Sequence, residues 1–212
     1  MDVVLPCLDE AAALPAVLAS LPPGCRAIVV DNGSVDGSPG VAEACGALVV
    51  HEPRRGYGAA VHTGLLAATS ELVAFADADG SLSLAELPAM VELLADADLV
   101  VGRRVPVRSE VWPWHARAGN AVIARLLRRR GLDVHDIAPL RVCRRSDLLA
   151  LDVRDRAFGY PLELLVRAAA AGWRVREVDV AYGPRAAGTR SKVSGSVRGT
   201  LRAARDMAGV LR

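Results

Sequence analysis

Short apolar runs alternate with helix-spaced segments along the first hundred residues of the chain. The runs that predict buried strands are 3–6, 27–30, 47–50, 72–76 and 99–101. In the first intervening segment Leu14, Val17 and Leu18 recur at helical spacing, and 58–68 and 84–94 show the same period. Because the strands are apolar throughout, both faces of their sheet must be covered. This predicts an α/β fold with a mostly parallel, Rossmann-like sheet flanked by helices.

Turn-forming and capping residues mark the ends of these segments. Asp9 and Ser83 are expected to cap the helices that follow them, and the Pro-Pro-Gly run 22–24 ends the first helix. The second half is less regular, and its expected elements are helices at 112–130, 162–171 and 197–211, strands at 136–142 and 175–180, and a loop at 185–195. We expect a single domain.

The composition excludes several classes of protein. Apolar residues make up 52% of the 212, so the chain can bury a core, yet no run reaches the roughly 20 apolar residues that a membrane-spanning helix needs. No basic stretch precedes an apolar one after Met1, which predicts no secretory signal and a cytoplasmic location. The cysteines at 7, 25, 45 and 143 form no CxxC site and are expected to be buried thiols.

Charge is divided unevenly along the chain. Residues 1–100 carry a formal charge of −11 and residues 101–212 carry +13, which together give the net charge of +2. An acidic half suits a divalent cation, and a basic half suits a phosphate, a nucleic acid or an anionic membrane, although charge can also fall unevenly by drift. Aromatic residues are only 4% of the chain and do not interleave with the basic run 128–130, so nucleic-acid binding is not expected.

Polar side chains follow the predicted strands where each strand leaves the core. These are the pairs Asp9 and Glu10, Asp31 and Asn32, Asp77 and Asp79, and Arg103 and Arg104. Ligands of open α/β sheets bind beyond the carboxyl ends of the strands, so we expect these side chains to converge on one crevice. Each acid alone can also be a helix cap or a turn residue.

Asp77 and Asp79 form the strongest local signal. Two carboxylates with one residue between them, on a strand leaving the core, need a cation or hydrogen-bond donors to lie side by side. Oxygen ligands of this kind suit Mg²⁺ or Mn²⁺, which bridge to substrate phosphates, and a diphosphate is the natural third partner. An acidic turn is the alternative interpretation.

The glycines at 56, 58 and 64 give a different kind of signal. Their spacing resembles a dinucleotide fingerprint, but Val61 occupies the place of the third glycine and the segment follows a loop, so a nicotinamide site is not expected. We expect these glycines to let the chain turn sharply into a helix and approach the bound ligand closely.

Motifs along nearly the whole chain resemble a known family when they are taken in order. They are 4–10, 30–37, 77–81, 101–104, Arg117 with Asn120, Asp136 with 139–141, Glu163 with 167–172, and 185–195. The arrangement resembles the family 2 glycosyltransferases of GT-A fold, in the branch of dolichyl-phosphate mannosyltransferases and bacterial polyprenyl-phosphate sugar transferases. The resemblance implies that 1–104 is a nucleotide-sugar-binding half and 105–212 an acceptor-binding half of one domain.

The resemblance also implies roles for individual residues. The base and ribose of a UDP- or GDP-linked sugar would contact Pro6, Leu8, Glu10, Asp31 and Asn32. Asp77 would help to hold the nucleotide, and Asp77 with Asp79 would bind Mg²⁺ or Mn²⁺. Acceptor or donor phosphates would be bound by Arg104, Arg117, Arg141, Arg190 and Lys192. The only lysine of the chain, Lys192, falls on the Ser-Lys motif of the family, which agrees with the affinity of Lys and Arg for phosphate.

The implied chemistry is an inverting displacement at the anomeric carbon, with the metal neutralising the leaving nucleoside diphosphate. If the acceptor is a hydroxyl, Asp136 or Glu163 must take its proton, whereas an ionised phosphate needs mainly positioning and electrostatic stabilisation. The chain departs from its relatives at Asn32, often aspartate there, and at Tyr57, often a cation. Ala138 and Leu140 replace a common Gly and Phe.

The sequence therefore predicts a metal-dependent glycosyltransferase whose acceptor is a polyprenyl phosphate. A soluble small-molecule acceptor, a nucleotidyltransferase, and a non-catalytic sugar-nucleotide-binding protein are the alternatives. The helix at 112–130 combines Trp112 and Trp114 with apolar and arginine residues, a composition that suits peripheral contact with the cytoplasmic face of a membrane. A buried helix with a solvated basic end is the other interpretation.

Overall fold

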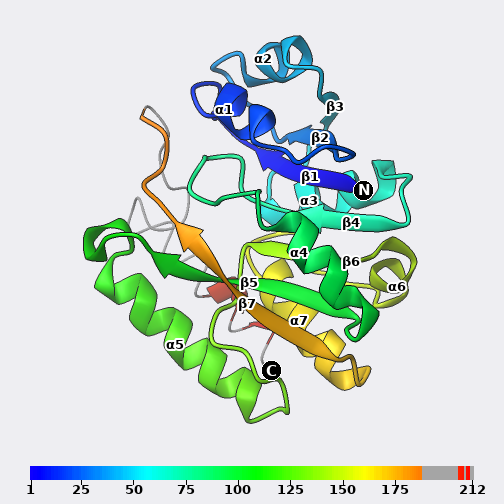
Figure 1. Ribbon diagram of the computed structural model, residues 1–212, viewed down its shortest axis with the longest axis vertical. Helices are drawn as coiled ribbons and strands as arrows, with labels where there is room; N and C mark the ends of the chain where they lie inside the picture. The colour runs from blue at the N-terminus through cyan, green and yellow to red at the C-terminus, as the bar shows by residue number, and fades with distance from the viewer. Residues whose placement is uncertain (188–204, 208, 211–212) are drawn as a thin grey trace.

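One seven-stranded sheet organises the part of the chain that the computed structural model describes, residues 1–187, 205–207 and 209–210. Its strand order is β3-β2-β1-β4-β6-β5-β7 (Figure 1). The strands are β1 (Asp2–Cys7), β2 (Arg26–Asp31), β3 (Leu48–His51), β4 (Leu72–Phe75), β5 (Leu99–Pro106), β6 (Leu140–Arg144) and β7 (Val175–Tyr182). Only β6 runs antiparallel to its neighbours, β4 and β5. The predicted mostly parallel, single-domain α/β fold is confirmed.

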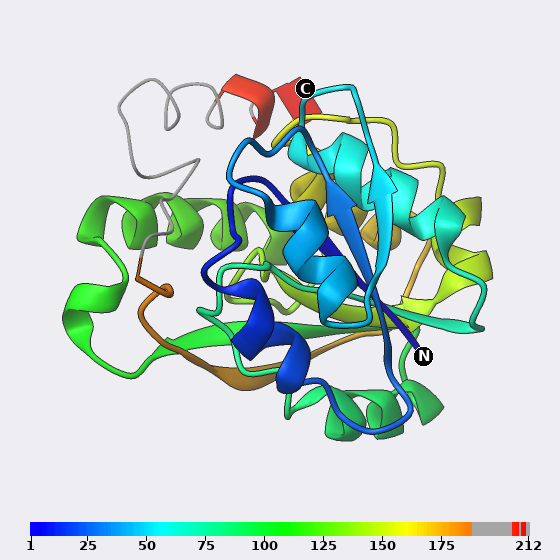
Figure 2. The ribbon, with the colours of Figure 1, turned by 90° about the horizontal axis from the view of Figure 1, so that it is seen from above.

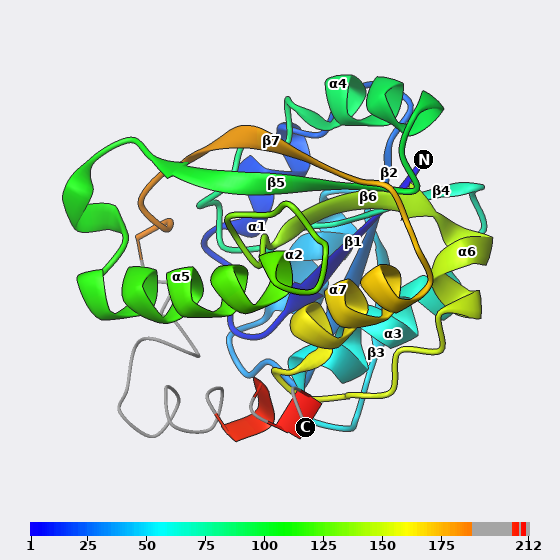
Figure 3. The ribbon, with the colours of Figure 1, turned by 90° about the horizontal axis from the view of Figure 1, so that it is seen from below.

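Helices cover both faces of this sheet. They are α1 (Leu14–Ala19), α2 (Ser38–Ala44), α3 (Tyr57–Ala67), α4 (Leu87–Glu92), α5 (Trp114–Arg128), α6 (Arg145–Ala150) and α7 (Tyr160–Ala170), with 3₁₀ turns at Leu93–Ala95 and Ser109–Val111. Buried residues of α1, α2 and α4 share one core with the sheet, and those of α3, α5, α6 and α7 share the other. Figure 3 shows α4 above the sheet and α3, α5 and α7 below it.

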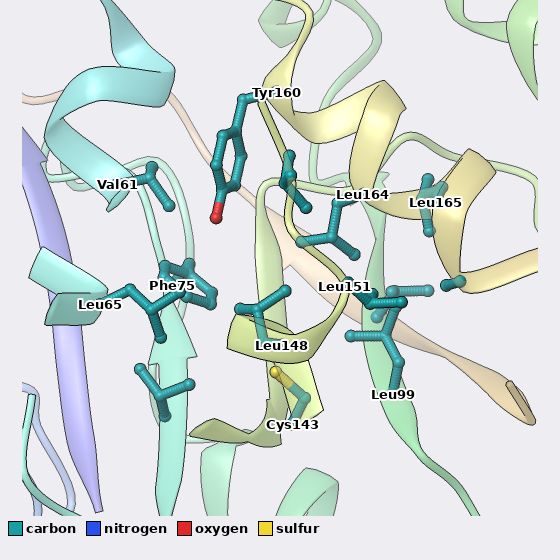
Figure 4. Packing of buried hydrophobic residues seen from close by; sticks show 14 of the residues in the cluster. Val61, Leu65, Phe75, Leu99, Cys143, Leu148, Leu151, Tyr160, Leu164 and Leu165 are labelled. Atoms are coloured by element: carbon teal, nitrogen blue, oxygen red, sulfur yellow. The ribbon is translucent and has the colours of Figure 1, made fainter. Parts of the chain in front are cut away.

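The core on the α3 and α7 side is built from closely packed aliphatic and aromatic side chains. Val61 and Leu65 of α3 lie next to Phe75 of β4, while Leu164 of α7 faces them from across the cluster (Figure 4). All four side chains are at most 2% exposed. Full burial of one such side chain contributes about 1.5–3 kcal/mol to the free energy of unfolding. This packing therefore fixes where the helices lie on the sheet.

Most predicted elements match the structure within a few residues, and the differences have physical causes. Asp9 does not cap α1: its φ is +53°, its carboxylate accepts the N–H of Val35, and the helix begins five residues later. Strand β5 continues to Pro106, so Arg103 and Arg104 lie within it and alternate between faces. The expected strand 136–142 begins only at Leu140, because 136–139 form a loop.

Other expectations are only partly met or lie outside the described residues. Cys7 and Cys143 are buried as expected, whereas Cys25 is half-buried and Cys45 is exposed. The expected loop 185–195 and the final helix 197–211 fall mostly outside the described residues.

The glycines at the start of α3 accommodate another segment of the chain. The N–H groups of Gly58 and Ala59 each donate a 2.9 Å hydrogen bond, to the carbonyls of Ala157 and Arg156 respectively. A Cβ on Gly56 would lie 2.1 Å from the Arg156 carbonyl oxygen, and one on Gly58 would lie 2.7 Å from that of Asp155. The glycines therefore let the segment 155–157 pack against the helix N-terminus, and their expected approach to a ligand stays a prediction.

Gly64 provides a test of how α3 packs on the sheet. A Cβ there would lie 2.3 Å from Val4 Cγ1 of β1 and 2.9 Å from Val30 Cγ2 of β2. We predict that Gly64→Ala lowers the free energy of unfolding by about 1–3 kcal/mol through overpacking, measured by urea denaturation. Gly40→Ala on α2, where a Cβ meets nothing within 4 Å, is the control and should not destabilise. Equal stability of the two variants would contradict this packing.

Ala138 tests a strained position in the loop before β6. It is a buried non-glycine residue with φ of +40°, a region that glycine enters freely and that costs alanine about 1–2 kcal/mol. We predict that Ala138→Gly unfolds at the wild-type temperature or above it, because relief of strain offsets the added chain entropy. Ala124→Gly, a buried site within α5, should by contrast cost about 1 kcal/mol. Equal losses in both variants, measured by thermal denaturation, would count against the strain.

Candidate active site

The carboxyl ends of the parallel strands bring most of the predicted site residues to one edge of the sheet. Cys7 at the end of β1 pairs in register with Asp31 at the end of β2, and β4 on the other side of β1 ends just before Asp77. Pro6 and Leu8 are half-buried there, and Glu10 is buried. The structure thus places the residues predicted to bind a nucleotide along two adjacent strand ends.

Asp31 is a buried carboxylate held by donors from its own loop. It accepts hydrogen bonds from the N–H groups of Gly33 and Ser34 and lies 3.3 Å from Nδ1 of His51. Burial raises the pKa of Asp31, but the hydrogen bonds from Ser34, His51 and Gly33 outweigh it and hold the pKa below its usual range. The side chain is therefore a fixed negative charge at the carboxyl edge of the sheet.

Asn32 holds the neighbouring loop in place. Its Nδ2 donates to the carbonyl oxygens of Glu52 and Arg54 at 2.9 and 2.8 Å, and its Oδ1 accepts the N–H of Gly56 at 2.8 Å. Both amide hydrogens are thus used inside the protein. Contact of Asn32 with a base stays a prediction, and its observed bonds position the segment between β3 and α3.

Asp77 and Asp79 follow β4 as predicted, and Asp79 has a cationic partner. Asp79 is buried, its Oδ1 accepts the N–H of Ser81 at 2.9 Å, and its Oδ2 lies 2.6 Å from Nη1 of Arg185. Burial and the charge of Asp79 raise the pKa of Asp77 to about 6. The charge of Asp79 therefore disfavours the ionised form of Asp77, which a bound cation would relieve.

The carboxylates of Asp77 and Asp79 fit a hard divalent cation whose other ligands are water molecules and substrate phosphates. Among the described residues no group of three or more His, Cys, Asp or Glu side chains could hold a metal ion. Two carboxylates on one turn match the habit of Mg²⁺, which takes one or two protein carboxylates and completes its shell with water and substrate phosphates. Asp77 and Asp79 can therefore supply part of a site, which a diphosphate and water would complete.

Arg104 lies in a cage of aromatic rings and one carboxylate. Its Nε and Nη2 donate to the two oxygens of Asp136 at 2.8 and 2.6 Å, and its backbone N–H also donates to Asp136. The guanidinium carbon lies 4.1 Å from the ring centre of Trp112 and 5.6 Å from that of Tyr182. Such stacking and forked bonding immobilise an arginine at little further entropic cost.

Arg103 does not join Arg104 in this cage. It forms a two-point ion pair with Asp179 of β7, at 2.6 and 2.7 Å, and both side chains are partly exposed. The expected convergence of the two arginines is therefore wrong, because neighbouring residues of a strand point to opposite faces. Of these two arginines, Arg104 is the one beside Asp136 and Trp112.

Arg141 is buried beneath the loop 136–139. Its Nε donates to the carbonyl of Ala138 at 2.9 Å, and its Nη2 donates to the carbonyl of Ile137. With Tyr57 and Tyr160 it lines a cavity of about 10 Å³, room for about one water molecule, and the Tyr160 hydroxyl has no hydrogen-bond partner within the described part of the chain. Arg141 thus supports the loop from below.

Glu163 lies apart from the other candidates. Its carboxylate accepts the N–H groups of Arg154 and Asp155 and pairs with Arg167 at 2.6 Å. Burial raises the pKa of Glu163, but these hydrogen bonds outweigh it and keep the pKa low. It lines a separate open pocket of about 720 Å³ that Arg205, Asp206, Gly209 and Val210 also line. No bond in the described residues joins it to the acid pair.

The remaining phosphate-binding candidates are less defined. Arg117 is exposed on the first turn of α5, and Arg190 and Lys192 lie outside the described residues. Arg185, Trp112 and Tyr182 were not predicted as site residues. Arg185 begins the basic loop that the sequence flagged, but its pairing with Asp79 depends on the path of β7.

Comparison with known proteins identifies relatives over nearly the full length of the chain. Residues 2–150 match the Glycosyl transferase family 2 domain. An uncharacterized glycosyltransferase of Mycobacterium tuberculosis is 61% identical over 208 residues, which are 97% of this chain and 95% of the relative. The dolichyl-phosphate hexose transferase of Haloferax volcanii is 34% identical (90% and 86% covered), and the undecaprenyl-phosphate mannosyltransferase of Micrococcus luteus is 32% identical (92% and 88% covered).

Solved structures confirm the fold class. Glucosyl-3-phosphoglycerate synthase from Mycobacterium tuberculosis, in complex with Mn²⁺, UDP and glucosyl-3-phosphoglycerate, superposes with a TM-score of 0.76 at 25% identity, covering 99% of this chain and 77% of that one. The seven-stranded sheet with acids at its carboxyl edge is therefore a GT-A fold. From the match over most of the chain and the likeness to these relatives, it follows that the chain belongs to glycosyl transferase family 2 and is a glycosyltransferase.

Proposed function

We propose that this glycosyltransferase moves a hexose from a nucleoside-diphosphate sugar to the phosphate of a polyprenyl phosphate. In this reaction a phosphate oxygen of the acceptor forms a bond to the anomeric carbon as the bond to the nucleoside diphosphate breaks, with inversion. Two relatives that align over about nine-tenths of this chain are named for dolichyl phosphate and undecaprenyl phosphate. The choice of a phosphate acceptor rests on the hydrogen bonds that the two candidate bases, Asp136 and Glu163, already accept.

All carboxylate oxygens of Asp136 and Glu163 accept hydrogen bonds from the protein itself. The two oxygens of Asp136 accept three hydrogen bonds from Arg104 and one from the N–H of Ala138, at 2.6–3.1 Å. Those of Glu163 are shared among Arg154, Asp155 and Arg167. A carboxylate offers about four acceptor positions, so Asp136 is saturated. An ionised phosphate acceptor has no proton to lose, and a hydroxyl acceptor does.

The two halves of the domain divide the substrates between them in this proposal. Residues 1–104 hold the nucleotide through Pro6, Leu8, Glu10, Asp31 and Asn32. Asp77 and Asp79 would hold Mg²⁺ or Mn²⁺, whose Lewis acidity offsets charge on the leaving diphosphate. Residues 105–212 hold the acceptor. Its phosphate would be neutralised by Arg104, at the end of the first half, together with Arg117, Arg190 and Lys192, while Arg141 supports the loop 136–139 from below. Asp136 fixes the guanidinium of Arg104 in the crevice.

A soluble phosphorylated acceptor is the second candidate. The solved structure reported above contains UDP, Mn²⁺ and a glucosylated phosphoglycerate. Its fold covers 99% of this chain, so the same crevice could orient a small acceptor. In that case a hydroxyl would need a base, and the bonds of Asp136 or Glu163 would have to rearrange.

A transfer assay separates these acceptors. Purified protein with Mn²⁺ and radiolabelled UDP- and GDP-hexoses is offered undecaprenyl phosphate in detergent or 3-phosphoglycerate in buffer. We predict label in the lipid phase, and a loss of about 100-fold or more in Asp79→Asn, since one group that stabilises the leaving charge contributes about this much. Asp98→Asn, a carboxylate paired with Arg174 away from the crevice, is the control and should keep its activity. Label only on the soluble acceptor would refute the lipid proposal.

The surface of α5 supports contact with an anionic membrane. The structure contains no helix within its described residues that is long and apolar enough to span a bilayer. Trp114 is 79% exposed and Val122 is 61% exposed, and Arg117, Arg125 and Arg129 are exposed on the same helix and its end. All three ribbon views place α5 on the far side of the molecule from the N-terminus (Figures 1, 2 and 3). Trp112, two residues before α5, stacks on the guanidinium of Arg104.

Vesicle flotation tests this contact. We predict that the protein floats with phosphatidylglycerol vesicles and not with phosphatidylcholine vesicles. Arg125→Glu with Arg129→Glu should weaken binding at least about tenfold, because each cationic side chain near an anionic surface contributes ~1 kcal/mol. The control is Leu66→Ser, which removes an exposed apolar residue of α3 that is 56% exposed. Flotation that is absent, or unchanged in the double variant, would argue against this surface.

A further inference from the structure

The loop that carries Asp136 is held by side chains from other elements. Glu177 of β7 accepts two backbone bonds from it at Oε1, from the N–H of His135 at 2.7 Å and from that of Asp136 at 3.0 Å. Its Oε2 lies 2.8 Å from Nδ1 of His135. The side chain of Glu177 is 10% exposed, and its strand position pairs with Val101 of β5, three residues before Arg104.

Asn120 of α5 makes two further hydrogen bonds to the same loop. Its Nδ2 donates to the carbonyl of His135 at 3.1 Å, and its Oδ1 accepts the N–H of Ile137 at 3.0 Å. Glu177 thus accepts the N–H groups of residues 135 and 136, while Asn120 bonds the carbonyl of 135 and the N–H of 137. The backbone of this residue is fixed by two buried or nearly buried side chains, since Asn120 is 8% exposed.

The fixed backbone determines where the carboxylate of Asp136 lies, and that carboxylate determines where Arg104 lies. Asp136 is 1% exposed and receives the Nε, the Nη2 and the backbone N–H of Arg104. A rotation of the peptide unit at 135–136 would move the carboxylate and break the forked pairing. The guanidinium would then lose its fixed place over Trp112. Small displacements of a positioning group can cost a factor of about 10² in rate.

We propose that Glu177 is a positioning residue for the transfer reaction: by accepting the N–H groups of His135 and Asp136, it holds Asp136 so that Arg104 faces the substrate phosphate. The role rests on the proposed function, because it takes Arg104 to be a phosphate-binding group. Glu177 itself contacts neither substrate in this scheme. Its effect passes through the peptide bonds at 135 and 136.

Kinetics of two Glu177 variants test the role. In the transfer assay with undecaprenyl phosphate, we expect Glu177→Ala to lower kcat about 10- to 100-fold, while the KM of the nucleotide sugar stays within about twofold because the residues proposed to hold the base and ribose are untouched. Glu177→Gln keeps an acceptor oxygen for both N–H groups and should recover kcat to within about threefold of the wild type. Asp179→Ala, two residues along β7, removes the ion pair with Arg103 and should leave both constants unchanged.

Hydrogen exchange supplies a reading that does not depend on activity. Amide protection in peptides covering 135–137 should fall in Glu177→Ala, stay near wild type in Glu177→Gln and be unaffected in Asp179→Ala. The inference is overturned if Glu177→Ala keeps at least half of the wild-type kcat, if Glu177→Gln is as impaired as the alanine variant, or if protection is unchanged. If the wild type transfers no sugar to a phosphate acceptor, the proposed function fails instead, and the exchange data still decide whether Glu177 holds the loop.

Discussion

Two negative charges at the end of one strand impose the main electrostatic constraint on this site. Asp77 and Asp79 follow the end of β4, where burial and the charge of Asp79 raise the pKa of Asp77 to about 6. The first half of the chain adds Asp31 and Glu10 near the ends of the neighbouring strands. The compensating charge comes from the second half, as Arg185 at 2.6 Å from Asp79. The fold joins an acidic half to a basic one along this edge.

The basic second half of the chain supplies cations that the protein already holds in place without a substrate. Arg104 is fixed between Asp136, Trp112 and Tyr182, and the loop of Asp136 is fixed in turn by Glu177 and Asn120. Donors that are already oriented stabilise developing charge without reorganisation at the moment of reaction. The same bonds occupy the oxygens of Asp136. This favours an acceptor that is already ionised, because such an acceptor needs no base to remove a proton.

Local patterns were sufficient to predict the sheet and the acids at its edge. The strands were visible as apolar runs, and Asp77 with Asp79 followed one of them, so both could be placed without knowing any distant contact. Contacts between distant segments were not visible: the pairing of Arg185 with Asp79, the stacking on Trp112 and the grip of Glu177 depend on how β5, β6 and β7 are ordered. Arg103 and Arg104 were predicted together because β5 was expected to end before them. Asp9 was expected to cap a helix because its unusual φ does not show in its sequence context.

Manganese binding followed by electron paramagnetic resonance tests the central claim most directly. The wild-type protein and Asp79→Ala are titrated with Mn²⁺, each with and without UDP or GDP. The account predicts that one nucleoside diphosphate tightens Mn²⁺ binding to the wild type at least about tenfold, since the diphosphate completes a metal shell that two carboxylates only begin. Asp79→Ala should lose this gain. Equal Mn²⁺ affinity in the two proteins with the diphosphate present would contradict a metal site at the acid pair.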